Sequence, residues 1–146
     1  MRVREATPAD AEALASLSGQ LGYAVDVPTM VHRLARVEGG VVLVALDAEG
    51  LVCAMAHAAP RRPLVAEPFV EIAALVVDEA ARGSGAGAVL LAAVETWAYE
   101  QGFTGVRVRS NVLRERAHRF YLREGYIEQK RQAVFLKRLN ATNAPT

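Results

Sequence analysis

The chain is poor in cysteine and in long apolar runs, and both shortages exclude some classes of protein. Cys53 is the single cysteine among 146 residues, so neither an internal disulfide nor a multi-cysteine zinc site can form. No run of about 18 apolar residues occurs, so we expect no membrane-spanning helix. The opening residues, MRVREATPAD, mix charge into the first turns and lack an apolar core, so we expect no signal peptide. A reducing cytoplasm is the expected compartment.

An excess of either charge is also missing. Seventeen Lys and Arg residues balance 16 Asp and Glu residues, and the formal net charge of +1 gives no argument for nucleic acid or a membrane surface as partner. Internal repeats and low-complexity linkers are absent, while 52% of the residues are hydrophobic, enough for a real core. We therefore expect one domain over residues 1–139, followed by a small polar tail, 140–146, that frays.

Strand-like and helix-like segments alternate along the chain. Apolar or alternating runs of strand length occupy residues 2–5, 41–47, 51–59, 69–77, 104–110 and 132–139. Helical patterns occupy residues 7–19, 28–37, 86–102 and 113–125. The order predicts an α/β or α+β domain with a mixed sheet and helices on its faces.

The most unusual stretch is RGSGAG, residues 82–87, at the start of a predicted helix. A phosphate-binding loop of the Walker A type needs a lysine after its last glycine, and Ala88 stands there instead. The dinucleotide fingerprint is formally present, but five residues separate the strand from the glycines, and Arg107 and Arg109 stand where its ribose-binding acid belongs. A plain turn needs one glycine rather than three. Bare backbone N–H groups at a helix N-terminus instead predict a site for an anion.

This loop resembles the acyl-CoA loop of the GCN5-related N-acetyltransferase (GNAT) family, whose pattern Arg/Gln-x-x-Gly-x-Gly/Ala is met by Arg82, Gly85 and Gly87. A second signature of the family matches Asn111 and AHRFYLREGY, residues 117–126. The resemblance extends over residues 2–139. It implies a GNAT fold with a mixed, mostly antiparallel sheet of about six to seven strands and about four helices. It also implies acetyl-CoA as co-substrate and an N-acetyltransferase activity.

The resemblance further implies a set of residues that bind the co-substrate. The backbone amides of Leu75 and Val77 match the family's contacts to the pantetheine arm and the thioester oxygen. The full set is Leu75, Val76, Val77, Arg82, Gly83, Ser84, Gly85, Ala86, Gly87, Ala88, Asn111, Ala117 and Tyr121.

Two side chains are the expected catalytic groups. Tyr121 matches the family tyrosine that protonates the leaving thiolate, although its ring could instead serve only the core. Glu71 lies inside the apolar run FVEIAALVV, where an unpaired carboxylate is costly and its pKa should rise, so we expect it to act as a base through water. Glu71 could instead bind substrate alone. His57, His118 and a water chain are the alternative bases.

The acceptor amine is the least defined part of this prediction. The chain is similar to the aminoalkylphosphonate and small-amine acetyltransferases, and Tyr23 lies in a loop that shapes the acceptor site of the family. Arg61 and Arg62 either meet an anionic acceptor group or form a solvated loop. No ligand spacing predicts a metal site. Protein or peptide N-acetylation and a non-catalytic acyl-CoA sensor stay open as alternatives, as does a homodimer.

Overall fold

The computed structural model describes residues 1–110 and 113–140. The chain divides into two compact units, Met1–Arg109 and Ser110–Thr146, which are described separately. Asn111 and the tail residues 141–146 lie outside the described residues, so their predicted roles stay predictions.

Five strands form one sheet in the first unit, in the order in which they occur along the chain. They are β1 (Arg2–Glu5), β2 (Val41–Leu46), β3 (Val52–Arg61), β4 (Phe69–Val77) and β5 (Val106–Val108). The first four pair antiparallel, as short hairpin connections allow, whereas β5 runs parallel to β4. A parallel neighbour needs a crossover, and helix α3 (Ala86–Glu100) supplies it.

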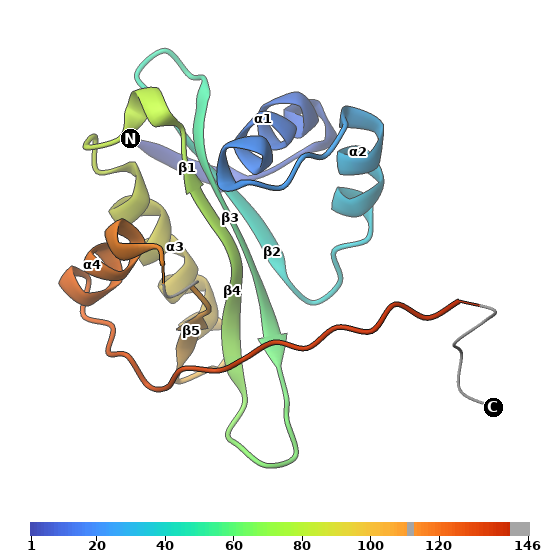
Figure 1. The fold of residues 1–146 in the computed structure, drawn as a ribbon. Coiled ribbons are helices and arrows are strands. Elements are labelled where there is room, and N and C mark those ends of the chain that lie inside the picture. Colours follow the sequence, from blue (N-terminus) through green and yellow to red (C-terminus); the bar gives the residue numbers. More distant parts are fainter. Residues whose placement is uncertain (111–112, 141–146) are drawn as a thin grey trace. The chain divides into compact units, whose positions relative to one another are not determined.

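Helices cover both faces of this sheet (Figure 1). Helices α1 (Ala11–Leu21) and α2 (Val27–Ala35) lie on one face, and α3 lies on the other. The main cluster of buried side chains fills the space between α1 and the sheet: Leu14, Leu17, Val44, Leu46, Met55 and Val76. Two 3-10 turns, η1 (Pro8–Asp10) and η2 (Glu79–Ala81), precede α1 and α3.

The predicted cap Thr7 starts the 3-10 turn η1, the α-helix α1 follows from Ala11, and the predicted helix end is wrong. Thr7 and Asp10 form a capping box, in which the Asp10 carboxylate accepts a hydrogen bond from the Thr7 N–H at 2.8 Å. Arg4 binds the same carboxylate at 2.8 and 3.0 Å. The helix passes Gly19 and ends at Leu21, because Gly22, with φ of 105°, takes the left-handed conformation that closes a helix.

Strand β4 contains a bulge in its middle. His57 of β3 pairs with Ala74, but the next residue of β3, Ala58, pairs with Ile72, so Ala73 has no partner. A bulge bends its strand and reverses the side to which later residues point. Bulges often lie next to active sites. Here the bulge falls where β5 stops, because β5 pairs with β4 only as far as Ile72.

The second unit contains one helix among its described residues, α4 (Glu115–Arg123). The predicted strand over residues 132–139 is not formed: every one of these residues is described, and none belongs to a helix or a strand. The described residues thus contain five strands and not six to seven. An alternating pattern can predict a strand, but a strand also needs a neighbouring backbone to pair with, and sequence does not show one.

Candidate active site

The loop between β4 and α3 is held by side-chain and backbone hydrogen bonds. The Asp78 side chain accepts from the N–H of Ala80 at 2.9 Å and starts the turn η2. Gln20, at the end of α1, accepts from the N–H of Glu79 through its side-chain oxygen at 2.9 Å. These contacts fix the entrance of the loop, and nothing in the sequence pattern of α1 singled out Gln20 for this task.

Beyond this entrance the backbone is bare. Gly83 and Gly85 have φ of 83° and 88°, the left-handed region that other residues avoid. In residues 82–88, the backbone N–H groups of Gly83, Gly85, Gly87 and Ala88 have no hydrogen-bond partner among the described residues. They cluster at the N-terminus of α3, where the helix dipole also favours negative charge, and Arg82 beside them is exposed. The predicted anion site therefore has the donors it needs.

The edge of β4 that faces β5 is open beyond the bulge. Asp78 donates its N–H to the carbonyl of Cys53 on the β3 side at 2.8 Å. Because successive N–H groups of a strand alternate in direction, those of Leu75 and Val77 point to the opposite side. No strand among the described residues pairs with residues 73–77 on that side. This edge offers unpaired amides to an extended ligand that leads away from the glycine loop.

Glu71 stands at the near end of this edge and is almost buried, with 11% of its side chain exposed. On sequence alone this carboxylate is treated as unpaired, and in the structure it has two partners. Arg61 donates its Nε–H to Oε2 at 2.9 Å, and Arg109 binds Oε1 through Nε at 3.1 Å. A carboxylate has about four acceptor positions, so two arginines leave room for a water molecule or an ammonium group.

The side chains around Glu71 share one face of the sheet. The register pairs Glu71 with Ala59 and with Arg107. The guanidinium of Arg107 lies 4.3 Å from the ring centre of Phe69. Alternation along β3 places His57, Ala59 and Arg61 on the face that also carries Met55 of the α1 core. Arg61 and Arg109 therefore bind one carboxylate, and Arg107 lies on the same face of the sheet; we call these four residues the arginine–glutamate cluster.

His57 lies on the same face as Glu71 and pairs with Ala74. Burial lowers its pKa below the ordinary value, and the positive charge of Arg61 lowers it further. The imidazole is therefore neutral at pH 7 and able to accept a proton. His57 thus remains an alternative base to Glu71.

Tyr121 lies on α4 in the second unit, packed among aromatic rings. Its ring centre is 5.1 Å from that of Phe120 and 5.8 Å from that of Tyr126. Burial raises the pKa of Tyr121 to about 12, and Arg114 opposes part of this rise. The phenol is therefore protonated throughout the neutral range, so its O–H can donate a hydrogen bond to a developing thiolate.

The other predicted residues fall in several places. Ala117 and His118 lie on α4, both partly exposed. Tyr23 follows α1 and is 68% exposed. Leu75 and Val77 are half-buried on β4, and Val76 points into the α1 core. Sequence reasoning missed Arg109 as a partner of Glu71, although the alternation of residues 106–109 does place it on the same face as Arg107.

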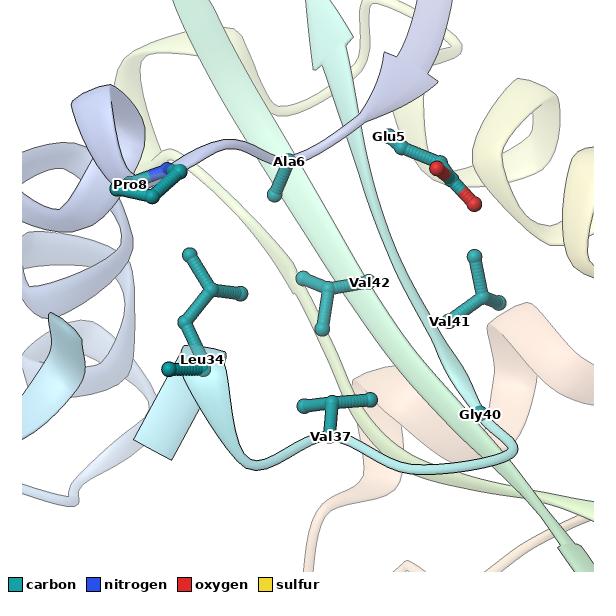
Figure 2. A pocket seen from close by; sticks show the side chains of 9 residues that line it. Glu5, Ala6, Pro8, Leu34, Val37, Gly40, Val41 and Val42 are labelled. Atoms are coloured by element: carbon teal, nitrogen blue, oxygen red, sulfur yellow. The ribbon is translucent and has the colours of Figure 1, made fainter. Parts of the chain in front are cut away.

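A pocket of about 310 Å³ lies elsewhere in the first unit (Figure 2). Leu34, Val37 and Val42 point into it, and the Glu5 carboxylate stands at its side. None of its lining residues belongs to the predicted site. Among the described residues no group of three or more His, Cys, Asp or Glu side chains is arranged to hold a metal ion. Those residues also include no helix long and apolar enough to cross a membrane.

Comparison with known proteins now decides the family. The family model described as "Acetyltransferase (GNAT) family" matches residues 13–126, a span that includes the glycine loop, β4 and α4. The chain belongs to the GNAT family of acetyltransferases. It is accordingly a GNAT N-acetyltransferase, with acetyl-CoA as the acetyl donor and an amine as the acceptor.

Named relatives agree with this assignment. An aminoglycoside N(6')-acetyltransferase type 1 from Stenotrophomonas maltophilia is 33% identical over 139 residues, 91% of this chain and 90% of the relative. The BH1408 protein from Bacillus halodurans, solved as a tetramutant, superposes with a TM-score of 0.80 at 24% identity over 94% of this chain and 100% of that one. The aminoglycoside N-acetyltransferase AAC(6')-Iy, solved with CoA, gives a TM-score of 0.80 at 19% identity, with the same two coverages. The two structures show that the GNAT fold is shared.

Proposed function

We propose that this GNAT enzyme transfers the acetyl group of acetyl-CoA directly to a primary amine of a small molecule, with the CoA pyrophosphate held by residues 82–87. The observation that carries the proposal is the set of four unpartnered N–H groups at the N-terminus of α3. A pyrophosphate supplies the acceptors that these donors lack. One helix terminus offers a nearby charge only about 0.3–1 kcal/mol, so the amides and Arg82 must act together.

The open edge of β4 then guides the rest of the co-substrate. The amides of Leu75 and Val77 point away from β3, where an extended pantetheine arm would accept and donate hydrogen bonds in place of a strand. Val76 fixes this segment by packing its side chain into the α1 core. Glu71 lies six residues before Val77, roughly 20 Å along an extended strand. An arm that follows this edge delivers the thioester toward Glu71, where an edge amide can stabilise the oxyanion.

The acceptor amine must lose a proton before it attacks. A lysine-like ammonium with a pKa of about 10.4 needs roughly 4.6 kcal/mol to become neutral at pH 7. We assign the removal of this proton to Glu71 acting through water, with His57 as the alternative. Tyr121 is assigned to the leaving sulfur. Because its pKa is about 12, it donates a hydrogen bond to the thiolate more readily than a full proton.

The remaining residues have supporting roles in the same proposal. Asn111 and Ala117 are assigned to the co-substrate on the family pattern, together with Ser84, Ala86 and Ala88. Tyr23 is assigned to the acceptor site, since it is exposed and therefore available to a ligand. The cytoplasm is the proposed compartment, because the single cysteine is buried and forms no disulfide. A homodimer is the assembly that light scattering should test first.

The decisive experiment is thiol release from acetyl-CoA, measured with a panel of amines, aminophosphonates, aminoglycosides and peptides. A small amine that accelerates release supports the proposal. Selective acceleration by peptides would favour protein or peptide N-acetylation. If CoA binds but no acceptor accelerates release, the chain is a non-catalytic acyl-CoA sensor.

A further inference from the structure

The arginine–glutamate cluster carries more positive charge than its single carboxylate can balance. Three guanidinium groups, those of Arg61, Arg107 and Arg109, share a sheet face with one carboxylate, that of Glu71. Arg61 and Arg109 approach Glu71 through their Nε atoms, and their side chains are 58% and 66% exposed. Because both side chains are more than half exposed, their guanidinium groups are accessible to the carboxylate or phosphonate oxygens of a ligand, which arginine suits well.

The position of this cluster ties it to the acceptor. Glu71 pairs with Arg107 one residue before the β4–β5 ladder ends at Ile72, and the bulge at Ala73 and the open edge follow. Phe69 and Arg107 stack at 4.3 Å beside it and give the cluster an apolar floor. A thioester brought along the open edge arrives at this end of β4. An amine that attacks it must therefore approach with its other groups near the arginines.

We propose that the acceptor is an amine that also carries an anionic group, a carboxylate or a phosphonate, and that Arg61 and Arg109 bind this group while Glu71 meets the ammonium. Two opposite charges on one small molecule match two opposite charges in the cluster. A polycationic aminoglycoside would instead place several ammonium groups against three guanidinium groups. The inference rests on the proposed function, because it names the acceptor class of the same site.

The test compares acceptors that differ in one charge. We would measure kcat/KM at saturating acetyl-CoA for β-alanine, its carboxamide, 2-aminoethylphosphonate and kanamycin. The carboxamide has the less basic amine, so any bias from amine ionisation favours it. We expect the carboxylate and the phosphonate to exceed both the carboxamide and kanamycin by about ten-fold or more. The ratio of phosphonate to carboxylate then identifies which anion fits.

Variants locate the effect. Arg61→Gln and Arg109→Gln should each raise KM for the anionic acceptors about ten-fold more than KM for the carboxamide. Arg62→Gln is the matched control, since this neighbouring guanidinium lies 5.0 Å from the ring centre of Phe103 and packs there. Rising ionic strength should raise KM for the anionic acceptors alone.

Several results would overturn the inference: preference for kanamycin or the carboxamide, or an Arg61→Gln enzyme that melts at a lower temperature but keeps its KM for β-alanine. The last result would make the cluster a structural bridge between β3, β4 and β5. Failure of the proposed function is a different result, namely no thiol release with any amine. In that case calorimetry of 2-aminoethylphosphonate with the CoA-bound protein still tests the inference. Binding that is lost in Arg61→Gln supports the inference, and no binding to the wild type refutes it.

Discussion

Gln20 and Glu79 are 59 residues apart in the chain, and the side-chain oxygen of Gln20 accepts the backbone N–H of Glu79 at 2.9 Å. Helix α1 is thereby joined to the entrance of the loop that we assign to the pyrophosphate. The bond lies on the surface, so its value is modest in free energy. Its consequence is positional, because it fixes the turn η2 that leads into the glycines.

Gln20→Ala should therefore weaken CoA binding by a few-fold to about ten-fold, since the loop must be ordered at the moment of binding. Gln20→Glu keeps an acceptor oxygen at the same distance and should retain most of the affinity. Isothermal titration with CoA measures both. Equal losses in the two variants would show that the hydrogen bond is not what matters.

Gly85→Ala should weaken CoA binding by roughly ten- to hundred-fold, because a methyl group would project into the space assigned to the pyrophosphate. In the protein itself this space is open, with no atom within 4 Å of the added carbon. The left-handed φ of 88° adds about 1–2 kcal/mol of strain.

Gly102→Ala is the matched control for that strain. Gly102 has φ of 89°, is equally open and lies just past the other end of α3. The two variants should lose similar thermal stability, and only Gly85→Ala should lose CoA. Normal CoA affinity in a folded Gly85→Ala protein would remove the loop from the site.

Tyr121→Phe should keep the affinity for acetyl-CoA and lower kcat by about 100-fold, the lower end of the range for a general acid. The pKa of about 12 makes complete proton transfer to a thiolate of pKa near 8.5 unfavourable, so the hydroxyl contributes mainly a hydrogen bond. The substitution keeps the ring contacts with Phe120 and Tyr126. An enzyme with unchanged kcat, when chemistry limits the rate, would assign Tyr121 to packing alone.

Glu71→Gln separates a base from a binding group. If the carboxylate relays the ammonium proton, kcat at neutral pH should fall by about 100-fold and recover in part at high pH, where more acceptor is already neutral. The acidic limb of the pH–rate profile should change as well. A raised acceptor KM with an unchanged limb indicates binding alone.

In that case His57 becomes the base to test. Its lowered pKa places its limb below about pH 6.5, and His57→Gln should remove that limb.

The Arg4–Asp10 pair should make stability depend on pH. The side-chain hydrogen bond from Arg4 lowers the pKa of Asp10 in the folded state. The contribution of the pair to the free energy of unfolding is therefore complete above the pKa of Asp10 in the unfolded chain, about 3.9. It is lost as the pH falls through the lower pKa of Asp10 in the folded state. The melting temperature of the wild type should drop by several degrees more between pH 5 and pH 3 than that of Asp10→Asn. Parallel melting curves for the two proteins would argue against the pair.

Local chemistry in the sequence determined a large part of this protein. The runs at residues 41–47, 51–59 and 69–77 became strands because apolar side chains of that length must be buried on a sheet. The glycines of residues 82–87 predicted an anion site, which we propose for the CoA pyrophosphate, because left-handed and unpaired backbone is otherwise costly. Arg82, Gly85 and Gly87 indicated the family. The capping residues Thr7 and Asp10 indicated where the first helical segment begins.

Only the tertiary structure decided what depends on pairing between distant segments. The bulge at Ala73 arises from the register between β3 and β4, and register is a property of two strands together. The two arginines on Glu71 come from different strands, ten residues before it in one case and 38 after it in the other, so no local pattern links them. For the same reason residues 132–139 have a strand pattern and no strand: burial and pairing are decided by neighbours that a sequence window does not contain.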